Sequence, residues 1–433
     1  MHHRPPLLPL LPALALLMTT LPVHAQRAGL TVPAQLPLQP VMSTAMDHKI
    51  RALPDALPLP ATLARKRELQ DHVRRHRDVL DTDAAGAPVI RSEVVAIEPT
   101  TEALDRARAA GFTVAGDRTL EELDLRIVVL RARSGAGTRA ALRTLRKLDP
   151  AGQYDFNHLY RSSGSASADT VATAQLPVSR PPAAPLRVGL IDSGVSREHP
   201  ALAGVDVRNW GCDGRLVPDA HGTAVGSLLV GAAGGATERG TTLFAADIYC
   251  GQPTGGAVTR YVEAMAWLAR ERVGVINLSL VGPHNALLQR ATQSLAARGH
   301  VLVAAVGNDG PAAAPLFPAA YPDVIGVTAV DHRKRALPEA GRGPHVDFAA
   351  PGSDLRAARP GGDWGPVRGT SYAAPLVARV AALYAPEPGA GRIAEVRARL
   401  TDAALDLGRT GRDEIYGDGL VGGGLAQPAV GDP

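Results

Sequence analysis

The sequence predicts an α/β fold in which a mostly parallel sheet is sandwiched by helices and preceded by a small α+β domain. Two observations lead to this prediction. In the larger, C-terminal part, short unalternated runs of valine, isoleucine and leucine are separated by amphipathic stretches, as in parallel sheets that are covered on both faces. In the N-terminal part, strand and helix patterns follow one another in the order β-α-β-β-α-β.

The first 25 residues predict a signal peptide. A short basic start is followed by the apolar run LLPLLPALALLMTTLPV and then by VHA, which has the small residues of a cleavage site. A membrane anchor is the alternative, but the run is short and interrupted by prolines, and no later stretch reaches the length of a spanning helix. We therefore expect an exported protein, periplasmic or extracellular, without a permanent membrane anchor.

Residues 26–90 combine a linker with a basic helix. Positions 26–60 are rich in proline, leucine and alanine and show no sustained period, which is typical of a linker. The stretch ATLARKRELQDHVRRHRDVL, at 61–80, then has a helical pattern with many basic residues. We interpret its charge as a solvated face, because no aromatic residue is interleaved as a nucleic-acid surface would require.

Residues 91–160 predict the small α+β domain. Helices are expected at 100–111 and 137–150, and strands at 93–97, 112–117, 125–132 and 153–160. The first helix is capped by threonine and stopped by Gly111, and the second is stopped by Asp149-Pro150. The resulting order is the ferredoxin-like, or split βαβ, arrangement.

A domain boundary is expected in residues 161–185. This segment, RSSGSASADTVATAQLPVSRPPAAP, has almost no bulky apolar side chains and is typical of a flexible, protease-accessible connection. Beyond it, residues 186–425 form the larger domain, with helices expected at 257–271 and 286–299 and strands at 187–192, 242–250, 274–281, 301–307 and 323–330.

Charge and cysteine content narrow the class of protein. Basic residues outnumber acidic ones 23 to 18 before Pro181, whereas the count from Pro181 onward is 23 to 24. The nearly neutral larger domain argues against nucleic acid as a partner.

An exported chain meets an oxidising environment, so Cys212 and Cys250 are expected to form a disulfide, with two free buried thiols as the alternative. Such a bridge would restrain the segment that contains His221.

Four polar residues stand where strands or turns of the predicted sheet end. Open α/β sheets bind ligands at the carboxyl ends of their strands, so these positions are candidate functional residues. Taken singly, each has an ordinary structural explanation, as a capping aspartate, a structural histidine, a turn-forming asparagine or an N-cap serine. The four residues are Asp192, His221, Asn308 and Ser371.

The order of these residues along the chain favours one catalytic scheme. The segment GTSYA is similar to a nucleophile elbow, but that fold needs a histidine after its serine, and none follows His345. A chymotrypsin-like order predicts an all-β chain, in conflict with the helices, although it could pair His221 with Asp309, Asp323, Asp331 or Asp347. The order that remains is Asp192, His221, Ser371.

Five segments resemble the successive motifs of the subtilisin-like serine peptidases, whose catalytic residues follow that same order. They are VGLIDSGV, HGTAVGSLLVG, VINLSLVGP, VAAVGNDG and GTSYAAPLVA. The tail GRDEIYGDGLV resembles the closing strand region of this family, so the resemblance covers about residues 186–425. It is specific because five motifs agree in order and spacing, and it implies the subtilisin-like fold for the larger domain.

The resemblance implies a serine endopeptidase that acts on proteins or peptides. Ser371 would attack the scissile carbonyl, His221 would take its proton and return it to the leaving amine, and Asp192 would orient the imidazole. Asn308 would donate its side-chain amide to the oxyanion, together with the backbone N–H of Ser371. The alternative is a catalytically silent binding protein of the same fold, which the four filled positions argue against.

Two segments correspond to the family's specificity pocket. Val281 replaces a common glycine and Val306 replaces a small residue, so we expect a narrowed pocket that favours small or medium side chains at P1, the residue before the cleaved bond. Ala224 stands where many members have a second histidine, which is not catalytic, so this change does not argue against the implied activity. The implied substrate-binding residues are Ser279, Leu280, Val281, Gly282, Ala305, Val306 and Gly307.

Residues 91–160 resemble the family's inhibitory propeptide by pattern, and this would make the protein a zymogen. The end of its last strand would occupy the active-site cleft, and self-cleavage would fall just after that strand or within residues 160–185. The alternative is a permanently attached accessory domain.

No cofactor is expected. Cysteine and histidine show no metal-ligand spacing, and the glycines of GDGLVG neither follow an evident strand nor open a helix. Calcium binding is common in the family, but no acidic loop indicates where a site would be.

Overall fold

The computed structural model describes residues 61–133, 135–162, 165–166, 185–231 and 240–422. The signal peptide predicted at 1–25, the linker predicted at 26–60 and most of the connection predicted at 161–185 lie outside the described residues. Among the described residues, every helix is too short or not apolar enough to cross a membrane.

The larger domain contains a seven-stranded sheet in which every neighbouring pair of strands is parallel. Its order is β15-β14-β13-β11-β8-β10-β9, so the chain crosses over between strands as the alternation of apolar runs and helices predicts. The strands are β8 (Arg187–Asp192), β9 (Asp206–Trp210), β10 (Thr242–Asp247), β11 (Val275–Leu278), β13 (Val301–Ala305), β14 (Val324–Val330) and β15 (Phe348–Pro351).

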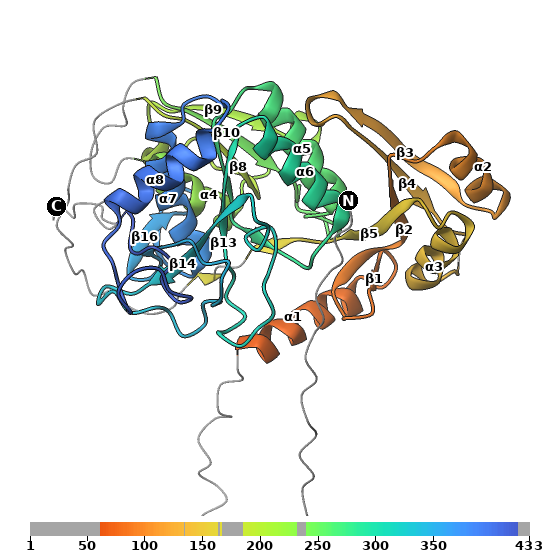
Figure 1. The fold of residues 1–433 in the computed structure, drawn as a ribbon, viewed down its shortest axis with the longest axis horizontal. Coiled ribbons are helices and arrows are strands. Elements are labelled where there is room, and N and C mark those ends of the chain that lie inside the picture. The colour runs from red at the N-terminus through yellow and green to blue at the C-terminus, as the bar shows by residue number, and fades with distance from the viewer. Residues whose placement is uncertain (1–60, 134, 163–164, 167–184, 232–239, 423–433) are drawn as a thin grey trace, which may run out of the picture. The chain divides into compact units, whose positions relative to one another are not determined.

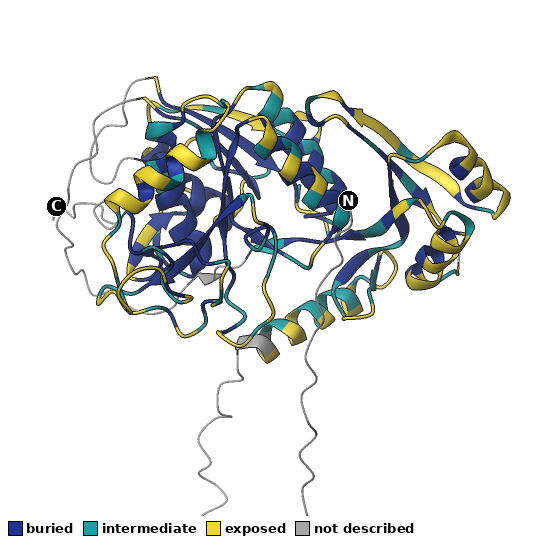
Figure 2. Cartoon of the chain, viewed as in Figure 1, coloured by how far each residue is buried: buried dark blue, intermediate teal, exposed yellow. Residues whose placement is uncertain are grey.

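Helices cover both faces of this sheet (Figure 1). One face packs against α4 (Ala220–Val230), α7 (Thr370–Tyr384) and α8 (Arg392–Ala403), and the other against α5 (Val258–Arg270) and α6 (Ala286–Ala297). Figure 2 shows buried strands between helices that expose only their outer sides, as on α8. Burial on both faces explains why these strands have no polar alternation. The α/β class predicted from the sequence is therefore confirmed.

The N-terminal domain is a five-stranded antiparallel sheet. Four of its strands lie in the order β5-β2-β4-β3, and β1 also pairs with β2. The predicted element order over residues 91–160 is the one observed. The elements are α1 (Ala61–Arg75), β1 (Leu80–Thr82), β2 (Pro88–Ile97), α2 (Thr101–Ala109), β3 (Thr113–Leu120), a 3₁₀ turn η2 (Glu121–Leu123), β4 (Leu125–Arg131), α3 (Thr138–Leu148) and β5 (Gln153–His158).

Two boundaries in this domain differ from those predicted. The helix expected at 61–80 ends at Arg75, because Leu80 begins β1, is fully buried and pairs with Ile90. The strand expected at 93–97 begins at Pro88 for the same reason, since its first residues pair with β1. Strand pairing with a distant segment overrides the local helical pattern at these positions.

The two faces of the N-terminal sheet have different partners. Val94 and Ala96 face α2 and α3, whereas Val95 and Ile97 belong to the same apolar cluster as residues of α5 and α6. The 3₁₀ turn η2 also packs on this side, where Ser294 of α6 donates a hydrogen bond to the Leu123 carbonyl. The sheet is therefore docked through apolar contacts rather than tethered only by its connection.

Short strands carry the chain from the N-terminal domain onto the larger one. β6 (Arg161–Ser162) pairs antiparallel with β12 (Leu280–Val281). β7 (Ser165–Ala166) pairs antiparallel with β17 (Trp364–Arg368), which also pairs with β16 (Leu355–Ala358). The segment predicted as a flexible connection therefore begins with residues that are ordered by pairing.

Candidate active site

The carboxyl end of β8 brings a carboxylate and an imidazole together. Asp192 is the last residue of β8 and is fully buried, and its Oδ1 lies 2.7 Å from Nδ1 of His221. The backbone N–H of Ser193 donates to the same Oδ1 at 2.7 Å. An ionised aspartate in this position orients the ring and leaves Nε2 of His221 as the nitrogen that can accept a proton.

The histidine is positioned by the start of α4. Asp219 caps this helix, and its Oδ1 accepts from the backbone N–H of His221 at 2.9 Å. Oδ1 of Asp219 also accepts from the Ser193 hydroxyl at 2.8 Å, which joins the cap to the residue after Asp192. Nε2 of His221 is buried and has no hydrogen-bond partner among the described residues. A buried basic nitrogen without a partner is a candidate proton acceptor.

Ser371 lies in the first turn of α7 and is fully buried. The preceding Gly369 has φ 131°, a conformation that glycine adopts without strain and that turns the chain from β17 into the helix. The Ser371 hydroxyl donates to the Ser279 carbonyl at 3.0 Å, and the Ser279 hydroxyl donates to the Ser371 carbonyl at 2.9 Å. The structure thus holds Ser371 against the strand predicted to bind substrate.

No hydrogen bond between Ser371 and His221 is formed among the described residues, because the Ser371 hydroxyl donates to the Ser279 carbonyl and Nε2 of His221 is unpaired. The two residues are nevertheless near each other, since the ring of Tyr372, the next residue along α7, lies 5.5 Å from the His221 ring between centroids. Catalytic hydrogen bonds are often long or poorly aligned outside the reacting complex, so this geometry is compatible with a serine–histidine pair.

Asn308 lies after β13 and contacts the same helix end. Its Oδ1 accepts from the backbone N–H of Thr370 at 3.1 Å, and the N–H of Gly307 donates to the Thr370 hydroxyl at 3.1 Å. Because Oδ1 accepts from the helix, Nδ2 is the donor group of this side chain. The amide is therefore fixed beside the N-terminus of α7, next to Ser371.

The residues predicted to bind substrate lie in two neighbouring segments, β12 with its flanks and the end of β13, and all are buried except the half-buried Gly282. Gly282 pairs with Phe317, through N–H and carbonyl bonds of 2.9 and 3.0 Å. A cavity of about 10 Å³ lies beside Val306 and Leu316, which is room for roughly one water molecule.

Leu316 also lines the segment that contains Val306 and Gly307, and the sequence analysis did not identify it. A Cβ at Gly307, the residue before Asn308, would lie 2.6 Å from Cδ1 of Leu316. The leucine side chain therefore occupies the space that a side chain at residue 307 would fill. No local pattern marks Leu316, and only its contact with Gly307 identifies it.

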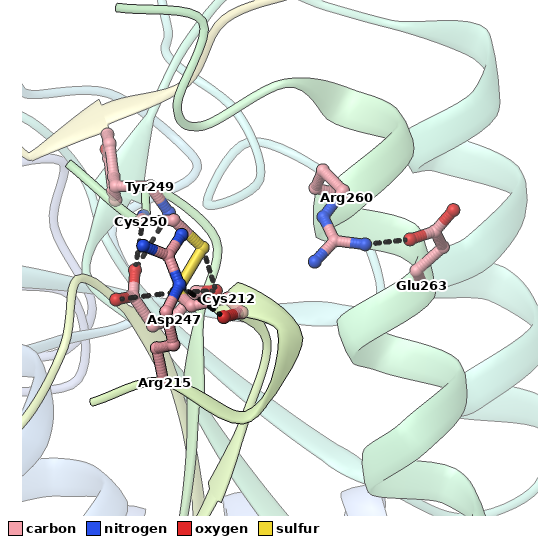
Figure 3. Close-up of a disulfide and its surroundings, with 7 residues drawn as sticks. All are labelled: Cys212, Arg215, Asp247, Tyr249, Cys250, Arg260 and Glu263. Carbon is pink, nitrogen blue, oxygen red and sulfur yellow. Dashed lines mark hydrogen bonds and ion pairs between the residues drawn. A yellow bond between two sulfur atoms is a disulfide. The ribbon is translucent and has the colours of Figure 1, made fainter. Parts of the chain in front are cut away.

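Cys212 and Cys250 form a disulfide, and Asp247 lies beside it (Figure 3). Oδ1 of Asp247 accepts from the N–H groups of Tyr249 and Cys250, each at 2.9 Å. Burial raises the pKa of Asp247, and the nearby carboxylate of Asp192 raises it further. The two sulfurs and this carboxylate are close enough to form a metal site, but sulfurs bonded to each other are not thiolate ligands.

Comparison with known proteins decides the family. A sequence profile described as "Subtilase family" matches residues 185–419, which is more than half of the chain. The chain belongs to the subtilase family. The subtilase match contains all four candidate residues and both cysteines.

Curated subtilases are similar to this chain over the same region. Subtilisin from Bacillus pumilus is 31% identical over 256 residues, which cover 54% of this chain and 88% of that protein. M-protease from Shouchella clausii (strain KSM-K16) is 31% identical over 251 residues, covering 54% of this chain and 62% of M-protease. This subtilase therefore spans less than two thirds of the length of some of its curated relatives.

A solved structure has the same fold. Fervidolysin from Fervidobacterium pennivorans, a keratinolytic enzyme related to subtilisin, superposes with a TM-score of 0.64 at 17% identity. The alignment covers 78% of this chain and 61% of fervidolysin. This likeness supports the subtilisin-like fold of the protein.

Proposed function

We propose that the protein is a serine endopeptidase that hydrolyses peptide bonds of protein substrates. The observation that carries this proposal is the buried contact of 2.7 Å between Asp192 and His221, with Ser371 in the first turn of α7 nearby. Membership of the subtilase family supports it.

In this mechanism the Ser371 hydroxyl leaves the Ser279 carbonyl, transfers its proton to Nε2 of His221 and attacks the substrate carbonyl. Asp192 stabilises the resulting imidazolium through Nδ1. The oxyanion is stabilised by Nδ2 of Asn308 and the N–H of Ser371, both at the N-terminus of α7. His221 then protonates the leaving amine, and water hydrolyses the acyl-enzyme by the same steps.

We further propose that residues 91–160 are a propeptide and that the protein is made as a zymogen. β6 lies on β12 on one side of Ser371, and β7 lies on β17 just before the turn into α7. An extended segment that pairs with strands on both sides of a nucleophile is bound in the way that a peptide substrate would be bound. We therefore place the self-cleaved bond between Ser162 and Ser165, within the range expected from the sequence.

Labelling with a fluorophosphonate probe, together with intact mass spectrometry, tests both proposals. The purified wild-type chain should be labelled on Ser371 and should lose the segment that ends between Ser162 and Ser165. Ser371→Ala should be neither labelled nor processed.

The outcomes separate the alternatives. A labelled protein that keeps residues 91–160 attached would show a permanent accessory domain. A folded wild-type protein without labelling would indicate the catalytically silent binding protein. Export to periplasm or medium stays part of the proposal and is tested by locating the mature protein after cell fractionation.

A further inference from the structure

We propose that a short chain of buried hydrogen bonds positions the backbone of Ser371 for attack. The chain runs from the side chain of Asn277 through the hydroxyl of Ser279 to the Ser371 carbonyl. Pro375, inside α7, makes this chain necessary. Asn277, Ser279 and Pro375 are positioning residues, because the groups concerned act on Ser371 rather than on the substrate. The proposal rests on the proposed peptidase function.

Pro375 deprives the nucleophile of a helical hydrogen bond. It lies inside α7, four residues after Ser371. In a regular helix the Ser371 carbonyl would accept from the backbone N–H of residue 375. Proline has no N–H, and its ring crowds the carbonyl of the residue four positions earlier. Helix α7 therefore cannot supply the usual donor for the carbonyl of Ser371.

Ser279 supplies a donor from another part of the fold. Its hydroxyl donates to the Ser371 carbonyl at 2.9 Å, and both residues are fully buried. Buried carbonyls are nearly always hydrogen-bonded in folded proteins. Because the carbonyl and the side chain of Ser371 share one Cα, a fixed carbonyl also fixes the direction in which the hydroxyl leaves the backbone.

Asn277 sets the direction of this bond. It is the third residue of β11 and is fully buried, and its Nδ2 donates to the Ser279 hydroxyl oxygen at 2.8 Å. A hydroxyl carries one hydrogen, so a Ser279 oxygen that accepts from the amide directs its own hydrogen to the Ser371 carbonyl. With the amide reversed, Oδ1 of Asn277 would compete for that hydrogen.

The orientation of Asn277 leaves one polar atom unsatisfied. Its Oδ1 is buried and has no hydrogen-bond partner among the described residues. Burying an amide oxygen without a partner is unfavourable, so such atoms call for an explanation. An apolar side chain of similar size would avoid this cost. The asparagine is therefore explained by what its N–H group does for Ser279, not by stability.

The chain can persist during the reaction. Two hydrogen bonds join Ser279 and Ser371 in opposite directions. Attack breaks the bond in which the Ser371 hydroxyl is the donor, since this hydroxyl must turn to His221. The bond from the Ser279 hydroxyl to the Ser371 carbonyl is compatible with attack, so it can hold the helix end while the nucleophile moves.

Pro375→Ala allows a test by rescue. Alanine restores an N–H at position 375, so the helix can hold the Ser371 carbonyl without Ser279. The test compares wild type, Ser279→Ala, Pro375→Ala and the double variant, each matured from the full chain. It measures kcat and KM on a fluorogenic peptide with the sequence of residues 158–166, HLYRSSGSA. The rate of self-cleavage of the full chain is a second readout that needs no added substrate.

The cost of losing the Ser279 hydroxyl should depend on the proline. With Pro375 present, Ser279→Ala should lower kcat about 10-fold, because one buried hydrogen bond is lost. KM should change less than about twofold, because the backbone of Ser279 is kept. In the Pro375→Ala background the same substitution should lower kcat less than about threefold. Equal losses in both backgrounds, or a loss in KM alone, would overturn the proposal.

Thr292→Val is the matched control for Ser279→Ala. It removes another fully buried hydroxyl, which donates to the Gln289 carbonyl at 2.8 Å within α6. Its Tm should fall, but its kcat should stay at the wild-type value. A kcat loss equal to that of Ser279→Ala would show that any buried hydroxyl has this effect, which contradicts a specific role of Ser279.

Asn277→Leu tests the first member of the chain. Leucine is close to asparagine in shape and removes both the donor and the unpaired Oδ1, so kcat should fall about 3- to 10-fold while Tm is retained or raised. In combination with Ser279→Ala it should cause no further loss of kcat. A lower Tm with unchanged kcat would refute the role of Asn277. The comparison of Ser279→Ala in two backgrounds does not depend on this variant.

These outcomes are distinct from failure of the proposed function. A wild-type protein that is labelled by the fluorophosphonate, and in which Ser279→Ala costs the same in both backgrounds, is a peptidase without this positioning chain. A wild-type protein that is neither labelled nor processed is not a peptidase, and the positioning proposal falls with that function.

Discussion

Oδ1 of Asp192 lies 2.7 Å from Nδ1 of His221, and the carboxylate has no exposed surface. The pair is therefore already formed in the intact chain, whereas the Ser371 hydroxyl is bonded to the Ser279 carbonyl. A substrate strand on β12 would bring its reacting carbonyl to Ser279 and Ser371. The imidazole of His221 is already oriented as a base, whereas the Ser371 hydroxyl must rotate away from the Ser279 carbonyl before it can donate to His221.

Asp192→Asn should reduce kcat on the order of 10⁴-fold with the fold retained, because an amide neither fixes the productive tautomer nor stabilises the imidazolium. The measurement is kcat on a peptide substrate, with thermal unfolding to show that the variant is folded. Asp206→Asn, at an exposed aspartate, is the control and should be close to wild type. A loss below tenfold in Asp192→Asn would argue against the assigned triad.

Asn308→Ala should lower kcat about 10²- to 10³-fold and leave KM nearly unchanged, because the oxyanion exists only after attack. Asn308→Asp distinguishes this role from a structural one. It keeps an oxygen for the Thr370 N–H but has no N–H of its own, so kcat should fall while thermal stability is retained. Recovery of kcat in Asn308→Asp would indicate that only the contact with Thr370 matters.

Leu316→Ala should widen the P1 preference toward larger residues. Its side chain fills the space beside Gly307, and its removal should raise kcat/KM for P1 leucine or phenylalanine by about tenfold or more relative to P1 alanine. Leu405→Ala, at an exposed leucine, should leave the ratio unchanged. A wild-type profile dominated by large aromatic P1 residues would contradict the narrow pocket.

Removal of the disulfide should destabilise the protein without abolishing the chemistry. The bond joins residues 38 positions apart and encloses His221, so Cys212→Ser with Cys250→Ser should lose about 3 to 4 kcal/mol of unfolding free energy. Thermal unfolding of wild type with and without reductant should show the same decrease. An unchanged Tm in the double variant would contradict this expectation.

The free energy of unfolding should decrease when the pH is lowered mildly, because buried histidines resist protonation in the folded state. Burial lowers the pKa of His300, although its bond of 2.7 Å to the Val273 carbonyl acts in the opposite direction. The unfolded chain then takes up the proton first, so the contribution to stability is complete above about pH 6.5 and is lost progressively as pH falls from that value to the lowered pKa of the folded state. Burial lowers the pKa of His345 as well, and its contribution has the same sign.

His300→Gln isolates this effect, since glutamine does not titrate and still carries an N–H donor for the Val273 carbonyl. In a Ser371→Ala background, which prevents self-digestion, the decrease in Tm between pH 7 and pH 5 should be smaller in His300→Gln. An identical decrease would show that His300 does not contribute.

Much of the fold follows from patterns local to the chain. Unbroken apolar runs predicted the buried strands of the larger sheet, and five of them are found there, with bounds that differ by a few residues. Caps and stops such as Thr100 and Gly111 predicted helix α2. Where a predicted helix end was wrong, as at Leu80, the residue pairs with another strand instead of following the helical pattern of its neighbours in sequence.

The sequence by itself therefore determined the α/β class, the order of elements in the N-terminal domain and the four candidate catalytic positions, because these depend on near neighbours and on motif order. Only the tertiary structure decided what Ser371, Tyr160 and Arg65 contact. Their partners Ser279, Pro283 and Ser162 lie 92, 123 and 97 positions away along the chain. No local pattern encodes such contacts, because they form only when separate elements pack and bury polar groups that must then be satisfied.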